Sequence, residues 1–165
     1  MQQLFLKYVR ELYEYLQLPE CAKIARRRDR LNLPLNDPGA RQVINCGLAW
    51  LCLAQDQSTS QDGGVARHFS LLNGWGPSYP ETTGYIIPTI LKGSEFSANK
   101  VLPLRAQRML DWLVSIQFPE GGFRGGTVFS KPLLPVTFNT GQILLGLANG
   151  VAFFGTPYRD AMRRA

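Results

Sequence analysis

The feature that most constrains the fold of this chain is an internal repeat. Residues 43–55 and 105–117 both have the pattern of an apolar helix that contains Trp-Leu and, four residues after the leucine, a glutamine. The tryptophans Trp50 and Trp112 are 62 positions apart. Such a period fits two helices plus a long loop, which is one helical hairpin per repeat. The repeat therefore predicts an all-α fold of hairpins that bury their apolar faces on their neighbours.

Each of these helices is followed by an acidic residue, two glycines, a long loop and a second apolar helix that opens with Thr-Gly. The opening threonines, Thr83 and Thr140, are 57 positions apart. We expect the second helices over Thr82–Leu91 and Thr140–Ala148, with a kink in the first at Pro88. In the first loop, Val65 to Leu72 can form short strands with a turn at Asn73-Gly74.

The ends of the chain differ from this repeat. Residues 3–30 are expected to be helical with a break at Pro19, and 31–40 to be a connector, so we divide the chain into an N-terminal segment 1–40 and a repeat domain 41–165. Thr156 to Ala165 parallels the stretch that begins at Leu102, with Pro157 matching Pro103. We therefore expect a fragment of a longer protein, an open arc of hairpins that self-associates through its last exposed face.

Charge and hydropathy exclude several classes of protein. The 165 residues carry 18 basic and 12 acidic side chains, a net charge of +6, but residues 42–153 hold seven basic and six acidic ones. This nearly neutral middle argues against a nucleic-acid groove. No apolar run reaches about 20 residues, so no transmembrane segment is expected. The N-terminus has no signal-peptide pattern.

The cysteines and the histidine do not have the spacing of a structural metal site. Cys21, Cys46 and Cys52 have no ligand spacing, and His68 is the single histidine, whereas structural zinc takes about four such ligands. The sequence also has no glycine-rich phosphate loop or dinucleotide fingerprint. We therefore predict no metal, no cofactor and no disulfide framework, which fits a cytoplasmic protein.

The polar entrance to the helix at 82–91 is the best candidate for a functional site. Pro80 can occupy the first turn, Glu81 would lie at the positive end of the helix dipole, and Thr82 and Thr83 can cap free N–H groups. Glu81 aligns with Phe138 in the next hairpin, so the repeat does not require it. An ionised carboxylate there suits a base, nucleophile or ligand-binding group better than a general acid. Simple helix capping is the alternative.

The surrounding loops supply the remaining candidate residues, which we expect to line a sugar-binding site. Aromatic faces stack on sugars, while carboxylates, amides and arginine bind hydroxyl or uronate groups. His68 and Trp75 are equally explained by structural roles, and Asp62 and Glu120 by a turn contact that recurs beside Gly-Gly. Glu81 is the catalytic candidate, and the substrate-binding candidates are Asp62, Arg67, His68, Trp75, Tyr79, Thr82, Arg124, Asn139 and Gln142.

The stretch from Arg108 to Phe123 combines a basic helix, Trp-Leu, Gln and Gly-Gly-Phe. It resembles the repeat of the terpenoid cyclase and protein prenyltransferase α/α toroids. The acid-Thr-Thr-Gly entrance at 81–84 is similar to that of six-hairpin glycosidase-like enzymes, such as unsaturated glucuronyl hydrolases. Over residues 41–165 the chain most resembles toroid proteins of bacterial polysaccharide-biosynthesis clusters.

This resemblance implies helical hairpins forming part of an α/α toroid, with short β-hairpins in the loops. The helices at 43–55 and 105–117 would be outer ones, and those at 82–91 and 140–148 inner ones. The implied function is that of a carbohydrate-active protein in bacterial polysaccharide biosynthesis or modification, with a glycan as its partner. If it is an enzyme, it would be a hydrolase, lyase or epimerase. The alternative is a non-catalytic scaffold or an isoprenoid- or lipid-binding domain, although the acid motif of squalene cyclases and the zinc ligands of prenyltransferases are absent.

Overall fold

The computed structural model of the chain describes residues 2–31 and 36–165, and it confirms a mainly helical fold with a short β-hairpin. The chain forms two compact units. One consists of Met1–Pro38 together with Phe69–Gly74, and the other of Gly39–His68 together with Trp75–Ala165. The second unit contains the helices of both predicted repeats.

The first unit holds helices α1 (Gln2–Gln17) and α2 (Glu20–Arg30), which are separated at Pro19 as predicted. Ion pairs one helical turn apart, Lys7 with Glu11 and Arg10 with Glu14, lie on the surface of α1. The large apolar side chains of α1 are nonetheless exposed, namely Leu4, Phe5, Leu6, Tyr8, Val9, Leu12, Tyr13 and Leu16.

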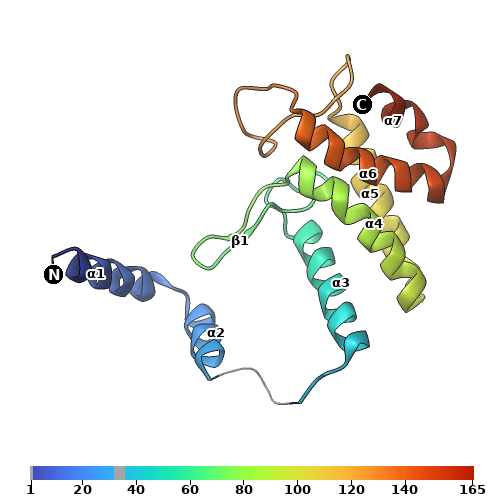
Figure 1. Cartoon of the computed structure of the whole chain (residues 1–165). Coiled ribbons are helices and arrows are strands. Elements are labelled where there is room, and N and C mark those ends of the chain that lie inside the picture. Colours follow the sequence, from blue (N-terminus) through green and yellow to red (C-terminus); the bar gives the residue numbers. More distant parts are fainter. Residues whose placement is uncertain (1, 32–35) are drawn as a thin grey trace. The chain divides into compact units, whose positions relative to one another are not determined.

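The second unit is built from four long helices and a short C-terminal one (Figure 1). α4 packs side by side with α6 and also packs against α5. The two central helices are longer than expected, because α4 starts with Pro80 at its first position and runs through Pro88, and α6 starts three residues before Thr140. The bounds are α3 (Ala40–Asp56), α4 (Pro80–Ser97), α5 (Val101–Ser115), α6 (Thr137–Phe154), the 3-10 turn η1 (Thr156–Tyr158) and α7 (Arg159–Arg164).

Two glycines allow α4 and α6 to approach closely. A Cβ atom on Gly84 of α4 would lie 2.5 Å from the Cα atom of Ile143, and one on Gly146 of α6 would lie 2.4 Å from the carbonyl oxygen of Gly84. Ile87 and Ile143, which flank this contact, are fully buried. Gly84 and Gly146 thus admit the neighbouring helix because they carry no side chain.

The entrances to α4 and α6 repeat the same hydrogen bonds. The N–H of Val65 donates to Thr83 Oγ1 and the N–H of Phe123 donates to Thr140 Oγ1, both at 2.9 Å. The residue before each helix is extended, with φ/ψ of −128°/117° at Tyr79 and −127°/121° at its counterpart in the second hairpin. The Thr-Gly motif thus marks one recurring structure in which a threonine hydroxyl receives a buried loop amide.

These contacts correct the predicted capping role of the threonines. No side-chain hydrogen bond caps the N-terminus of α4. The hydroxyls of Thr82 and Thr83 both donate to the carbonyl oxygen of Tyr79, at 3.2 and 2.8 Å, and Thr83 receives the amide of Val65 from the preceding loop. Thr83 therefore fixes the loop to the helix, because its hydroxyl points toward the loop that enters the helix.

The glutamine that follows each Trp-Leu motif binds the first helix of the next repeat. Gln55 Nε2 donates to the carbonyl oxygens of Gly63 and Arg105, at 2.9 and 3.2 Å. Gln117 Nε2 donates to the carbonyl oxygen of Ala161 of α7 at 2.8 Å. The same contact therefore places Ala161 in the third copy where Arg105 lies in the second.

This assignment shifts the predicted alignment of the third copy by two residues. The sequence comparison matched Pro157 to Pro103, whereas the contacts match Ala161, not Arg159, to Arg105. The difference arises because Pro157 lies in the 3-10 turn before α7, whereas Pro103 lies inside the first turn of α5. A shared proline was therefore a poor guide to the register.

The β-hairpin between α3 and α4 is smaller than predicted. Strand β1 (Phe69–Ser70) pairs with β2 (Gly74–Trp75). Residues 71–73 form the turn, which begins two positions and ends one position before the predicted Asn73-Gly74. Ser70 Oγ holds this turn by accepting the amides of Leu72 and Asn73 at 3.3 and 3.2 Å. An isolated bridge between Ala66 and Ser78 joins the two sides of the loop nearer the helices.

Candidate functional site

A polar cluster at the helix entrances links the two hairpins. Tyr79 Oη donates to Glu81 Oε2 at 2.9 Å. Asn139, in the first turn of α6, donates from Nδ2 to the same Glu81 oxygen at 3.2 Å and to Tyr79 Oη at 3.4 Å. Asn139 is only 5% exposed, whereas Tyr79 and Glu81 are half-buried. The carboxylate is thus held in place by an almost buried amide of the next hairpin.

Two further side chains flank this cluster. The guanidinium of Arg67 lies over the ring of Tyr79, with 5.2 Å from Cζ to the ring centroid. Tyr85 lies one helical turn after Glu81. Burial, followed by the charges of Glu81 and Tyr79, raises the pKa of the Tyr85 hydroxyl above its ordinary value. The sequence analysis did not select Tyr85, although its spacing of four residues from Glu81 on a helix could have indicated it.

Glu81 presents its carboxylate at the N-terminus of a helix. It lies in the first turn of α4, where free backbone N–H groups and the helix dipole attract negative charge. The two hydrogen-bond donors on Oε2 hold the carboxylate in a fixed orientation. The arrangement suits a fixed anionic hydrogen-bond acceptor. Thr82 is adjacent, but its hydroxyl is directed to the backbone.

Asp62 braces its own loop. One oxygen, Oδ1, accepts hydrogen bonds from Ser78 Oγ at 2.6 Å and from the N–H of Gly64 at 3.1 Å. Ser78 is fully buried and also exchanges a hydrogen bond with Ser58 at 2.7 Å. These contacts agree with a turn contact beside Gly-Gly, and they engage Asp62 away from Glu81.

Arg124 has a similar role in the second loop. Its guanidinium donates to the carbonyl oxygen of Val128 at 2.8 Å and to that of Ser130, while Nε is buried without a partner. The N–H of Val128 in turn donates to the carbonyl oxygen of Ser78 at 3.3 Å. Arg124 therefore shapes a loop that contacts the entrance of the first hairpin.

The remaining candidates lie apart from the Glu81 hydrogen bonds. The ring of His68 packs over Gly76, where a Cβ atom would lie 2.8 Å from the imidazole. Trp75 packs against Trp50, with 4.7 Å between ring centroids. Gln142 is half-buried on α6. Of the predicted residues, the structure thus brings together Arg67, Tyr79, Glu81 and Asn139, with Thr82 beside them.

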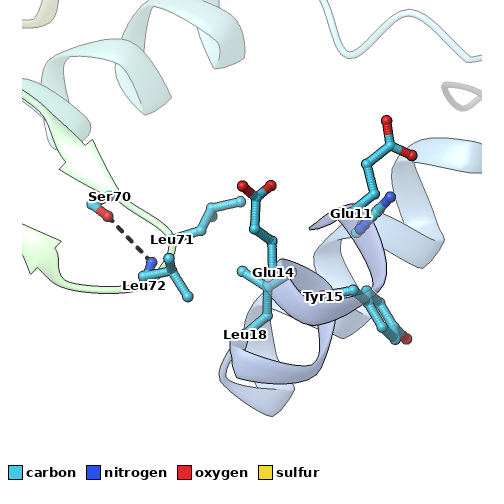
Figure 2. A pocket seen from close by; sticks show the side chains of 8 residues that line it. Glu11, Glu14, Tyr15, Leu18, Ser70, Leu71 and Leu72 are labelled. Carbon is cyan, nitrogen blue, oxygen red and sulfur yellow. Dashed lines mark hydrogen bonds between the residues drawn. The ribbon is translucent and has the colours of Figure 1, made fainter. Parts of the chain in front are cut away.

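A cavity of about 590 Å³ lies in the first unit (Figure 2). Glu11 and Glu14 extend from α1, and Leu71 and Leu72 come from the tip of the β-hairpin. Both carboxylates pair with basic groups of the same helix, at 3.9 and 2.8 Å. The third charged lining residue, Arg26, lies over the ring of Tyr15 at 5.2 Å. The cavity contains none of the predicted site residues, and we regard these charged groups as part of a helix surface.

The part of the chain that the structure describes, residues 2–31 and 36–165, holds neither a group of metal ligands nor a membrane-spanning helix. In these ranges, no three residues among histidine, cysteine, aspartate and glutamate are grouped as a metal site would require. Nor does any helix in them have the length and apolar character needed to cross a membrane.

Comparison of the chain with models of known protein families, with curated proteins and with solved structures found no match. The likeness to α/α toroids stays a prediction from the residues quoted above. The chemistry of the Glu81 site is therefore the best guide to function, because one fold can carry many functions.

Proposed function

We propose that the chain is a carbohydrate-binding domain of the α/α-toroid type that serves bacterial polysaccharide biosynthesis or modification. The observation that supports this best is the cluster of Tyr79, Glu81 and Asn139 at the junction of two hairpins, with Arg67 against the tyrosine ring. This cluster combines a fixed carboxylate, an amide, a guanidinium and an aromatic surface. Such groups recognise the hydroxyls and carboxylates of sugars and uronates.

Each side chain has a role in this proposal. Glu81 accepts hydrogen bonds from sugar hydroxyls, and Tyr85 offers a partly exposed ring beside it. Arg67 binds an acidic sugar or a hydroxyl pair from above Tyr79. Asn139 positions Glu81, because its amide is nearly buried and donates to the carboxylate. The ligand thus contacts a surface contributed by both hairpins.

The cluster favours binding over hydrolysis. Hydrolysis of a glycosidic bond generally uses two carboxylic groups about 5–10 Å apart. Asp62, the carboxylate of the same loop, is engaged by Ser78 and the backbone of Gly64. Tyr79 and Asn139 hold the Glu81 carboxylate in place, which suits a fixed hydrogen-bond acceptor for sugar hydroxyls.

A glycan array, followed by titration calorimetry on any glycan that binds, tests the proposal. Glu81→Gln removes the charge with little change of shape and should weaken binding at least tenfold. Glu120→Gln makes the same change on an exposed carboxylate of the second hairpin and should leave binding unchanged. Absence of binding to any glycan by the unmodified chain, or equal affinity of Glu81→Gln, would refute the proposal.

A scaffold that self-associates is a second candidate, favoured by the surface of α6. Phe138 and Leu145 are 64% and 51% exposed. Gly141, which corresponds to Gly84, has open space where Gly84 meets Ile143. Sedimentation analysis of the unmodified chain and of Leu145→Glu tests this function. A monomer at all concentrations would exclude it, and dissociation by Leu145→Glu would support it.

A further inference from the structure

An apolar groove of about 610 Å³ lies between α3 and α4, and none of the residues of the Glu81 cluster lines it. Its volume lies in the usual range of small-molecule sites, about 300–1,000 Å³. Its polar side-chain groups are the hydroxyl of Thr89, the ammonium of Lys92 and the indole N–H of Trp50. The lining residues are Ile44, Gly47, Leu48, Trp50, Leu51, Thr89, Lys92, Gly93 and Phe96.

Comparison with the second hairpin shows why this groove is open. Leu48 packs on Gly93 in the first hairpin as Leu110 packs on Gly150 in the second, so the helix pairs α3–α4 and α5–α6 correspond closely. At the position of Gly47 the second hairpin has Met109, which is fully buried. A Cβ atom on Gly47 would have nothing within 4 Å. The missing methionine side chain therefore leaves space in the groove.

A second difference opposes a helix as the occupant. The second hairpin contacts α4 of the first through Gly146 of α6. A Cβ atom on Gly146 would lie 2.4 Å from the carbonyl oxygen of Gly84. The corresponding residue of the first hairpin is Thr89, which lines the groove. Its side chain prevents a helix from approaching α4 as closely as α4 approaches α6. The groove thus admits a slender chain more readily than another hairpin.

The charge at the edge of the groove is positive. Lys92 lines the groove, and Arg41 of α3 places its guanidinium over the ring of Phe96 at 5.6 Å. The nearest carboxylate along α4, Glu95, lines a different cavity, between α4 and α6, which Lys92 also borders. An anionic group at the mouth of the groove would therefore meet two basic side chains.

From these observations we propose that the α3–α4 groove binds a single-chain amphiphile with a carboxylate head, the chain lying over Gly47 and the head beside Lys92. The exposed indole of Trp50 forms one wall and the ring of Phe96 another. This site is independent of the glycan-binding function proposed above, because it shares none of the residues assigned to that function.

The experiment uses the fluorescent fatty acid cis-parinaric acid with the full chain. Its emission should rise on saturable one-to-one binding, and dodecanoate should displace it better than dodecanol. Gly47→Met introduces the residue of the second hairpin and should weaken binding at least tenfold, with an unchanged or higher melting temperature since the site is unobstructed. Lys92→Glu should weaken binding several-fold and remove the preference for dodecanoate.

Arg163→Glu, which makes the same charge change on α7 outside the groove, is the control and should bind as the unmodified chain does. Absence of saturable binding, or Gly47→Met binding with full affinity, would overturn the proposal. A chain that binds no probe and is a dimer which Gly47→Met converts to a monomer would instead identify a second copy as the occupant, and this too would overturn it.

Discussion

Replacing Thr83 by valine should lower the free energy of unfolding by about 2 kcal/mol. Valine keeps the shape of threonine but removes the hydroxyl that receives the amide of Val65 at 2.9 Å. Thr83 is fully buried and Val65 is 1% exposed, so water cannot replace this bond. A buried donor left without a partner costs about 1–3 kcal/mol. The carbonyl of Tyr79 adds little, because it still accepts the amide of Thr83 and the hydroxyl of Thr82.

The neighbouring Thr82→Val is the matched control. Thr82 is half-buried, and its hydroxyl makes a single 3.2 Å bond to a carbonyl that has two other donors. Its loss should cost less than about 1 kcal/mol. Thr140→Val, which removes the equivalent bond to the amide of Phe123, should cost about as much as Thr83→Val.

Urea unfolding followed by tryptophan fluorescence measures these differences, because all three tryptophans lie in the unit that contains the hairpins. With a slope of about 2 kcal/mol per molar urea, Thr83→Val should lower the midpoint by about 1 M. Equal midpoints for Thr83→Val and Thr82→Val would refute the reasoning, since the two variants differ chiefly in the buried amide.

Two further predictions follow from the helix contacts. Gly84→Ala should lower the free energy of unfolding by about 1–3 kcal/mol, because its Cβ atom would lie 2.5 Å from the backbone of α6, whereas Gly141→Ala, with open space, should raise it by about 0.5–1 kcal/mol in the same urea assay. Burial, then a hydrogen bond to Asp111, raises the pKa of Tyr158 to about 12. The stability that Tyr158 contributes is therefore complete below its unfolded pKa of 10.0 and is lost as the pH rises through about 12. The melting temperature of the unmodified chain should fall between about pH 9.5 and 11.5, and Tyr158→Phe should make this fall smaller.

The hairpins could be predicted because local sequence determines them. The glutamine after Trp-Leu and the threonine of Thr-Gly recur, and each makes the same contact in both copies. The same reasoning placed Glu81 in the first turn of a helix, where the structure has it. A repeated motif carries this information, because equal residues at equal spacing favour equal contacts.

The parts that could not be predicted depend on contacts between distant residues. The hydrogen bond between Asn139 and Glu81 joins residues 58 positions apart, so no local pattern specifies it. The two helices predicted at 82–91 and 140–148 were too short at both ends. The prediction relied on the Thr-Gly motif, which the additional residues of α4 and α6 do not contain. Whether Asp62 braces a loop or faces a ligand depended on Ser78, a residue of the opposite side of the loop.

The paired contacts within each hairpin also bear on how such a chain can arise. The packing of Leu48 on Gly93 and the bond from Val65 to Thr83 lie inside the first hairpin, and both recur inside the second. A duplicated gene segment would therefore encode the contacts that stabilise its own hairpin. Between copies, the glutamine contact also recurs, whereas the glycine crossing of α4 with α6 and the bond from Asn139 to Glu81 occur once among the described residues. The helix entrances at the junction of two copies are therefore where duplicates can diverge and where a new binding surface can evolve.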